Sequence, residues 1–317
     1  MKNFHVTPAE SGVRLDKILA TRFPKNSRST WQGLIENNAV MVNDHPIKSR
    51  YLTQVNDVVT IQKHSEPEIA VTKSADLDII FENRDVVVIN KPFGLITHPA
   101  HSHTEDSVAQ RIIFYDPTIK NAVYDPESKI SLMRPGIVHR LDKDTSGAMI
   151  IAKNKSAMTF LANQIQKHLA QKTYLALIYG WLEQDEITVT NFLGRDQNDR
   201  RKMALVSAEK GREAITEIKI VSQLRSKKGD KVTLIEARPI TGRTHQIRVH
   251  CAYLGHPVMG DKVYTFKEAS DLSARVGLHR QFLHASTLEI RLPESDTRST
   301  FTAPLPADLE KALHQFE

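Results

Sequence analysis

The chain has 317 residues and a formal net charge of +6, with 40% hydrophobic and 25% charged residues, which excludes a wholly disordered, collagenous or disulfide-scaffolded protein. The positive balance favours a polyanionic partner. The single cysteine, Cys251, excludes an intramolecular disulfide and a cysteine-ligated metal cluster. The sequence starts without a signal-peptide pattern and contains no apolar run of membrane-spanning length, so we expect a cytoplasmic protein with no membrane association.

The N-terminal residues predict a small domain of helices followed by strands. Apolar residues at helical spacing predict a helix over residues 14–21, and Ser29 is expected to cap a second helix. Residues 39–42 and 57–61 read as strands, and a turn is predicted at residues 43–46. A domain of this size can bury only a marginal core of its own.

The polar stretch at residues 65–68 has no hydrophobic periodicity and is typical of a linker. We therefore expect two domains, residues 1–68 and residues 69–317. In the second domain the best strands are predicted at residues 86–90, 148–152, 173–178, 232–237 and 288–292. Helices are predicted at residues 156–169 and from Thr244 onward. This irregular order favours an α+β domain with a mixed, largely antiparallel sheet flanked by helices.

The segment from Arg134 to Gly147 concentrates glycines, carboxylates, a histidine and several cations directly before a predicted strand. In an arbitrary protein such a loop is most often a salt-bridged, solvated turn. Here, however, residues 139–147, HRLDKDTSG, resemble over their full length the active-site signature of the pseudouridine synthases that modify large-subunit ribosomal RNA and some transfer RNAs. The resemblance continues at residues 88–99, 172–174, 241–250, 255–261 and 283–285.

The resemblance covers residues 75–310, and the N-terminal portion separately resembles the S4-like RNA-binding domain of the ribosomal members. It implies that the protein isomerises a uridine in RNA, without a cofactor. In the matched motifs, Asp142 corresponds to the catalytic nucleophile or base, Tyr174 to the active-site tyrosine that stacks on the uracil, and Arg248 to the basic residue that pairs with the aspartate. Whether the carboxylate attacks C1′, attacks the uracil ring or assists a glycal intermediate stays open.

Further contacts follow from the same motifs. Arg140 corresponds to an arginine that contacts the RNA where the target base has left the stack. The remaining substrate-binding candidates are His139, His98, Lys91 and Arg243. In the N-terminal domain, the candidates for binding RNA phosphates are Arg14, Lys17, Arg22, Arg28, Gln32 and Lys48. Two basic clusters, residues 195–202 and 225–231, are expected at hairpin tips of the second domain.

No metal site is expected. His98, His101 and His103, which Glu105 and Asp106 follow, lie in a loop without a recognisable ligand spacing. His245, His250 and Cys251 do not share one face of a helix, and Cys251 falls on the apolar stripe. No glycine-rich phosphate-binding motif is present, which argues against nucleotide cofactors and against a methyltransferase.

The expected partners are RNA, foremost large-subunit ribosomal RNA or pre-ribosomal particles, and the protein is expected to be a monomer. Two alternatives stay open at this point. The substrate could be transfer RNA, or the chain could be a non-catalytic RNA-binding factor of ribosome assembly that kept the fold.

Overall fold

The computed structural model describes residues 2–24, 28–36, 38–62, 76–99, 106–126, 128–199 and 202–317. The chain divides into two compact units, and each is described by itself. The first comprises Met1–Ala70 with Val123–Arg134, and the second comprises Val71–Ala122 with Pro135–Glu317. The stretch predicted as a linker, residues 65–68, lies outside the described residues.

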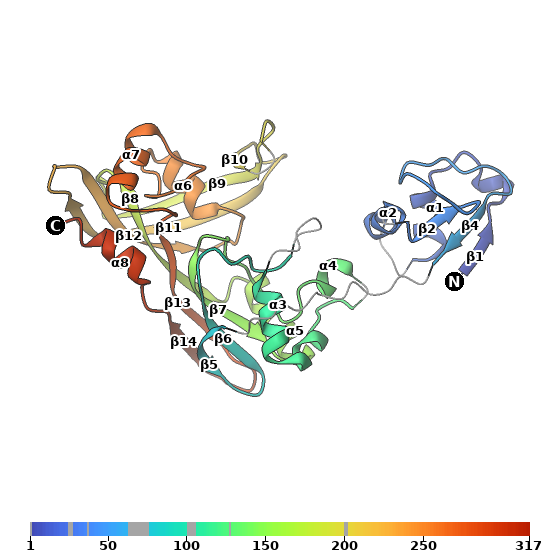
Figure 1. The fold of residues 1–317 in the computed structure, drawn as a ribbon, viewed down its shortest axis with the longest axis horizontal. Helices are drawn as coiled ribbons and strands as arrows, with labels where there is room; N and C mark the ends of the chain where they lie inside the picture. The colour runs from blue at the N-terminus through green and yellow to red at the C-terminus, as the bar shows by residue number, and fades with distance from the viewer. Residues whose placement is uncertain are drawn as a thin grey trace. The chain divides into compact units, whose positions relative to one another are not determined.

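The first unit contains a four-stranded antiparallel sheet in the order β1-β4-β2-β3 (Figure 1). Its elements are β1 (Lys2–His5), the 3-10 helix η1 (Pro8–Glu10), α1 (Leu15–Arg22), α2 (Arg28–Glu36), β2 (Val40–Val42), β3 (His45–Pro46), β4 (Val58–Ile61) and, from the later segment, α4 (Lys129–Leu132). Leu15, Leu19, Ile35, Val40 and Val59 form a small core between helices and sheet.

Both predicted helices of this unit are confirmed, as are the strands β2 and β4. α2 begins at Arg28, one residue before the predicted cap Ser29, whose side chain lies outside the described part of the chain. The predicted turn is shorter than expected. Asn43 and Asp44 have φ values of 51° and 63°, which close a tight hairpin, so His45 already pairs with Val42. β1 was not predicted, because an edge strand of four residues has too few positions to show alternation.

The second unit is built on a ten-stranded sheet in the order β10-β9-β11-β12-β8-β13-β7-β6-β5, with β14 paired to β13. Its strands are β5 (Asp78–Glu82), β6 (Val86–Lys91), β7 (Ser146–Ala152), β8 (Gln171–Tyr179), β9 (Glu186–Arg195), β10 (Met203–Leu205), β11 (Arg212–Arg225), β12 (Lys231–Pro239), β13 (Leu283–Arg291) and β14 (Arg298–Thr302). Among the paired strands that the structure describes, β7 and β13 alone are parallel. The predicted α+β class and largely antiparallel sheet are therefore confirmed.

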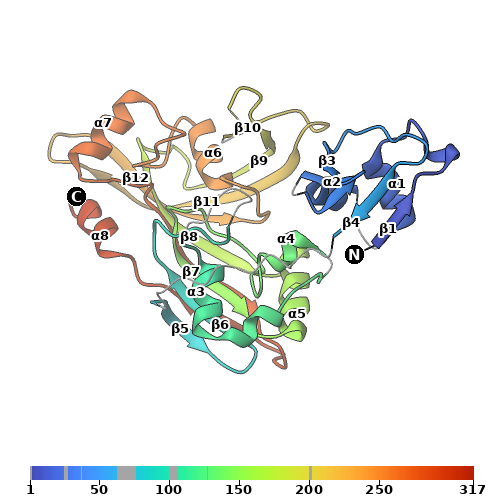
Figure 2. The same cartoon turned by 45° about the vertical axis from the view of Figure 1, so that its right-hand side comes forward.

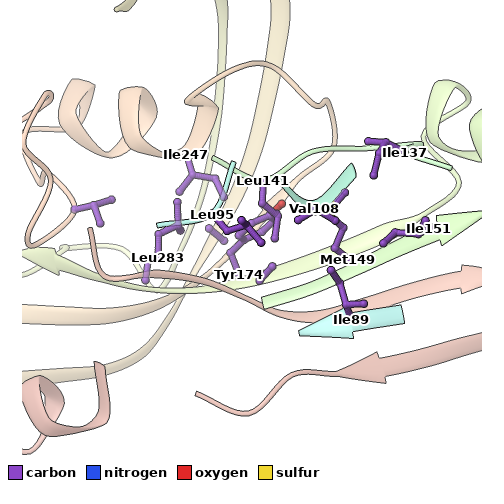
Figure 3. Packing of buried hydrophobic residues seen from close by; sticks show 14 of the residues in the cluster. Ile89, Leu95, Val108, Ile137, Leu141, Met149, Ile151, Tyr174, Ile247 and Leu283 are labelled. Carbon is purple, nitrogen blue, oxygen red and sulfur yellow. The ribbon is translucent and has the colours of Figure 1, made fainter. Parts of the chain in front are cut away.

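Helices cover both faces of this sheet. They are α3 (Val108–Tyr115), the 3-10 helix η2 (Pro117–Asn121), α5 (Lys155–Gln166), α6 (Gln246–Tyr253), α7 (Lys267–Arg275) and α8 (Ala307–Leu313). Alternate residues of β6 face opposite ways: Val87 and Ile89 pack in one core with residues of α3 and α6, while Val86 and Val88 pack in another with α5. Figure 2 shows α6 beside β9 and β11, and Figure 3 shows the first of these cores.

Two predicted helices differ at their ends from the structure. The helix predicted to Leu169 ends at Gln166, and His168 has a left-handed φ of 56° that a continuing helix excludes. The helix predicted from Thr244 begins at Gln246, after His245. The basic cluster at residues 225–231 lies at the hairpin end between β11 and β12. In the other cluster, residues 195–199 and 202 lie at the connection between β9 and β10, and residues 200–201 lie outside the described residues. No helix in the described ranges combines the length and apolar character that a membrane span requires.

Candidate active site

Asp142 lies in the loop that leads into β7, and this loop joins the sheet where β7 and β13 run parallel. Gly147 pairs with Ala285 there and has a φ of 121°. A Cβ atom at Gly147 would lie 2.3 Å from the carbonyl oxygen of Ala285. Only glycine permits both this conformation and this close approach. The glycine of the HRLDKDTSG motif therefore sets how the loop enters the sheet.

The loop is tied down on both sides of Asp142. The hydroxyl of Thr97 donates to the carbonyl of Leu141 at 2.8 Å and accepts from the Leu141 N–H at 3.2 Å. On the other side, the Lys91 ammonium donates to the carbonyl of Lys143 at 3.1 Å. The backbone of Asp142 is thereby held between two buried side chains, one at the end of β6 and one in the segment that follows it.

Lys91 does not fit its predicted role in substrate binding. Its side chain is fully buried, and Nζ also donates to the carbonyls of Pro92 at 2.8 Å and Leu95 at 2.7 Å. An ammonium group has three N–H donors, so Lys91 has none left for a substrate. Burial lowers the pKa of Lys91 to about 7, although the charges of Asp142 and Asp144 oppose this shift.

Arg248, on α6, connects Asp142 to a second carboxylate. Its Nη1 donates to Asp142 Oδ2 at 3.2 Å, while Nε and Nη2 donate to the two oxygens of Asp261 at 2.6 and 2.9 Å. Burial disfavours the guanidinium charge, but the hydrogen bonds and charge of Asp261 outweigh it and raise the pKa of Arg248. Asp261 thus fixes a permanent cation that points one N–H group at Asp142.

Tyr174, on β8, lies in the same core as Leu141 and Ile247 (Figure 3). These two residues directly precede Asp142 and Arg248 in the sequence. Burial, and then the charge of Asp142, raise the pKa of its phenol well above the ordinary value. Tyr174 is therefore a neutral phenol at pH 7. The three residues predicted to carry the chemistry come from a loop, a strand and a helix, and the fold brings them together.

Two more side chains complete this cluster, and the sequence analysis assigned neither a role. His245 Nε2 lies 3.8 Å from Asp142 Oδ2, and His245 Nδ1 lies 2.8 Å from the hydroxyl of Tyr264. The Tyr264 ring lies under the Arg248 guanidinium, with 5.1 Å between the Arg248 Cζ and the ring centroid. Tyr264 comes shortly after the matched residues 255–261, and this proximity to a family motif was the signal in the sequence that could have identified it.

Comparisons with known proteins agree with this arrangement. The family model described as RNA pseudouridylate synthase matches residues 85–253, and the S4 domain model matches residues 13–59. An uncharacterized RNA pseudouridine synthase of Synechocystis is 38% identical over 306 residues, which are 95% of this chain and 88% of the relative. The chain belongs to the RNA pseudouridylate synthase family.

Other relatives are similar over most of the chain. Ribosomal large subunit pseudouridine synthase D of Pseudomonas aeruginosa is 33% identical and covers 94% of this chain and 90% of its own. The solved structure of human RNA pseudouridylate synthase domain containing 1 matches 74% of this chain and 85% of its own, with a TM-score of 0.57 and 26% identity. The protein is an RNA pseudouridine synthase with an N-terminal S4 domain, and the resemblance seen in the sequence is confirmed.

The other predicted substrate-binding residues of the synthase lie in different settings. Arg140 is exposed. His139 Nε2 accepts from the backbone N–H of Ile150 in β7 at 3.0 Å, and burial lowers its pKa to about 3, so this ring supports the sheet. Both ring nitrogens of His98 are buried. Arg243 donates from Nε to the carbonyl of Glu213 in β11 at 2.8 Å. His101, His103 and Glu105 lie outside the described residues.

In the S4 domain, a buried carboxylate gathers three of the six predicted RNA-binding side chains. Arg14 donates to Asp16 at 2.7 Å, Arg28 donates to it at 3.1 Å, and Gln32 also donates to it. Asp16 has no exposed surface, and although burial opposes the shift, these hydrogen bonds lower its pKa to about 2. No pattern in the sequence indicated this shared partner.

The other three predicted side chains are arranged differently. Arg22 is held by Glu10, with 2.6 Å between Arg22 Nε and the carboxylate, and its guanidinium lies over the ring of Phe4. Lys17 and Lys48 are exposed. The S4 surface therefore combines arginines of fixed orientation with accessible lysines.

Proposed function

We propose that this synthase converts uridine in large-subunit ribosomal RNA to pseudouridine, with Asp142 as the catalytic carboxylate. The observation that carries the proposal is the contact of 3.2 Å between Arg248 Nη1 and Asp142 Oδ2, in a loop anchored on both sides of Asp142. The ribosomal substrate is supported by the S4 domain and by relatives named ribosomal large subunit pseudouridine synthase D.

The chemistry requires few groups. The bond between uracil N1 and ribose C1′ breaks, C5 bonds to C1′, the proton on C5 leaves, and N1 regains one, so atoms balance without a cofactor. A carboxylate beside the ribose can attack C1′, attack the ring or take a proton from C2′, and all three routes need its ionised form. In this proposal Arg248 orients the carboxylate of Asp142. Tyr174, as a neutral phenol, forms a wall for the flipped uracil.

The proposal includes the division of labour between domains. Residues 1–68 would bind structured RNA through Lys17, Lys48 and the arginines around Asp16, and residues 69–317 would carry the chemistry. Free ribosomal RNA or a pre-ribosomal particle would be the partner of a monomeric enzyme. We accordingly place the protein in the cytoplasm, together with that substrate.

Replacing Asp142 by asparagine tests the catalytic assignment. Asp142→Asn keeps the size of the side chain but removes the charge, and we expect the rate to fall by more than about 10³-fold while RNA binding persists. The rate is measured as release of tritium from C5 of uridine in a large-subunit ribosomal RNA transcript. Asp271→Asn, at an exposed position of α7, is the control. Turnover by Asp142→Asn close to the wild-type rate would refute the assignment.

Mapping pseudouridine in total RNA, with and without this protein, tests the substrate. We expect sites to disappear from large-subunit ribosomal RNA when the protein is absent. Loss of pseudouridine from transfer RNA alone would overturn the ribosomal target and leave the proposed role of Asp142 intact.

A further inference from the structure

His245 occupies an unusual backbone position beside the proposed catalytic carboxylate. It is the residue directly before α6, with φ 56° and ψ 17°, in the left-handed region that few residues other than glycine adopt. Such conformations persist where the surroundings over-determine them, often at functional sites. Here the ring is held between Tyr264 on one side and Asp142 on the other.

The hydrogen bonds around Tyr264 favour one position for the proton of the imidazole ring. The backbone N–H of Met203 donates to the Tyr264 hydroxyl oxygen at 2.7 Å. This bond uses one lone pair of the oxygen and leaves the hydroxyl proton available to donate to His245 Nδ1, 2.8 Å away. Burial lowers the pKa of His245 against the opposing charge of Asp142, so the ring is neutral at pH 7. A neutral ring that accepts at Nδ1 carries its proton on Nε2.

The negative charge of Asp142 disfavours the other tautomer of His245, which carries its proton on Nδ1. With the proton on Nδ1, the lone pair of Nε2 would face Asp142 Oδ2 at 3.8 Å. A lone pair directed at a carboxylate oxygen is repelled, whereas an N–H group there is attracted. The Met203 amide and the Asp142 carboxylate therefore favour the same tautomer from the two sides of the ring.

We propose that Tyr264 and His245 are a positioning pair that selects the reactive oxygen of Asp142. His245 Nε2 and Arg248 Nη1 both face Oδ2, at 3.8 and 3.2 Å. The hydrogen bond from Arg248 and the electrostatic attraction of the Nε2–H group act on the same oxygen, so they favour one orientation of the carboxylate and leave Oδ1 for the ribose or the uracil. His245 and Tyr264 act through Asp142, so the inference rests on the proposed catalytic role of that residue.

The first test removes one hydroxyl. Tyr264→Phe keeps the ring beside Arg248 but removes the group that sets the His245 tautomer, and we expect kcat to fall about 10- to 100-fold with KM unchanged. The assay is tritium release from C5 of uridine in the large-subunit ribosomal RNA transcript. Tyr115→Phe, which removes a hydroxyl that donates to Glu82 at 2.7 Å, is the matched control.

The second test compares the kcat of two variants, His245→Asn and His245→Gln. A positioning role and a purely structural role of His245 predict opposite rankings of these two variants. Asparagine tolerates the left-handed backbone better than glutamine does, but its amide reaches only the position of Nδ1. The amide of glutamine reaches the position of Nε2 and can donate to Asp142. We therefore expect His245→Gln to retain a higher kcat than His245→Asn, although His245→Asn should be the more stable in thermal unfolding.

The outcomes separate the two proposals. If Asp142→Asn is inactive while Tyr264→Phe has the wild-type kcat, or while His245→Asn is at least as active as His245→Gln, the positioning pair is refuted and the catalytic role of Asp142 stands. If Asp142→Asn remains active, both proposals fail together. A selective loss of kcat in Tyr264→Phe, with glutamine above asparagine at position 245, supports the pair.

Discussion

Lys91 shows how a single buried side chain can hold the backbone of a loop in place. Its ammonium donates to the carbonyls of Pro92, Leu95 and Lys143, and the last of these directly follows Asp142. All three hydrogen bonds would be lost if the ammonium were absent; the bond to Leu95 is buried, and an unpaired buried carbonyl costs about 1–3 kcal/mol. The charge itself is costly to bury, which offsets part of this contribution.

Lys91→Met should therefore destabilise the protein. Methionine fills a similar volume and removes the buried charge, but it makes none of the three hydrogen bonds, and we expect the free energy of unfolding to fall by about 3 kcal/mol. Urea unfolding at pH 7 measures the change. Lys155→Met, at an exposed position of α5, is the control. A loss no greater than in the control would show that the three hydrogen bonds contribute nothing net.

At the residue scale, the sequence was a good guide to which residues meet and a poor guide to their partners. Asp142, Tyr174 and Arg248 were selected together by their motifs, and the fold brings them together. The buried carboxylates Asp16 and Asp261 were missed, because the tertiary structure is what brings Arg28 to Asp16 and Arg248 to Asp261. Lys91 was assigned to the substrate because a sequence does not reveal burial.

α6 illustrates the element scale, because polar contacts attach it to the sheet. Gln246 donates to the carbonyl of Ile215 and to the hydroxyl of Thr216 in β11, both at 2.9 Å. One turn later, His250 Nδ1 also lies 2.9 Å from the Thr216 hydroxyl. His250 has no exposed surface, and burial lowers its pKa to about 4. The helix that carries Arg248 is thus anchored by a histidine that must remain neutral.

This histidine should make the fold sensitive to acid. The pKa of His250 is about 4 in the folded protein, below its ordinary value of 6.5. Between these values the unfolded chain binds the proton and the folded chain does not, so the free energy of unfolding falls as the pH falls. Between pH 7 and pH 4 the free energy of unfolding of His250→Gln should therefore fall by less than that of the wild-type protein, with a difference of up to about 3 kcal/mol.

Urea unfolding of His250→Gln at both pH values measures this difference. His314→Gln, at an exposed position after α8, is the control and should lose stability on acidification as the wild-type protein does. The same acid-induced loss in wild type and in His250→Gln would exclude His250 as the source.

Elements were predictable where both faces are buried or one face is clearly apolar. β6 and β7 were found because their apolar residues form continuous runs. β11 was not identified, because most of its side chains are exposed or half-buried and it gains its structure by pairing with β9 and β12. Its weak pattern reflects a strand stabilised by its neighbours more than by its own apolar face.

At the scale of the whole molecule, each unit has a hydrophobic core of its own. The cluster around Leu15 and Val59 belongs to the first unit, and the clusters on the large sheet draw only on the second. RNA binding and chemistry should therefore be separable. Of the expected basic surface, the lysines Lys17 and Lys48 and the arginines around Asp16 lie in the first unit.

Deleting residues 1–68 should weaken binding of large-subunit ribosomal RNA while the active site survives. The slope of log affinity against log salt should become shallower by about 0.7–0.9 for each phosphate that the shortened protein no longer neutralises. Filter binding at several salt concentrations measures the slope, and tritium release at saturating RNA measures the remaining rate. Lys17→Glu combined with Lys48→Glu, in the full chain, should shift affinity and slope in the same direction. Unchanged affinity and slope in the deletion would contradict the proposed role of the domain.

The place of β13 within the sheet has a consequence for how the enzyme is made. β13 lies between β8 and β7, and it joins the strands β8 to β12 to the strands β5 to β7. During translation, Asp142, Tyr174 and Arg248 are all synthesised before Leu283, the first residue of β13. At about 5–20 residues per second, the strand that aligns them follows Arg248 by several seconds. A nascent chain that has not yet reached Leu283 therefore lacks the strand that joins the two parts of the sheet around these three side chains.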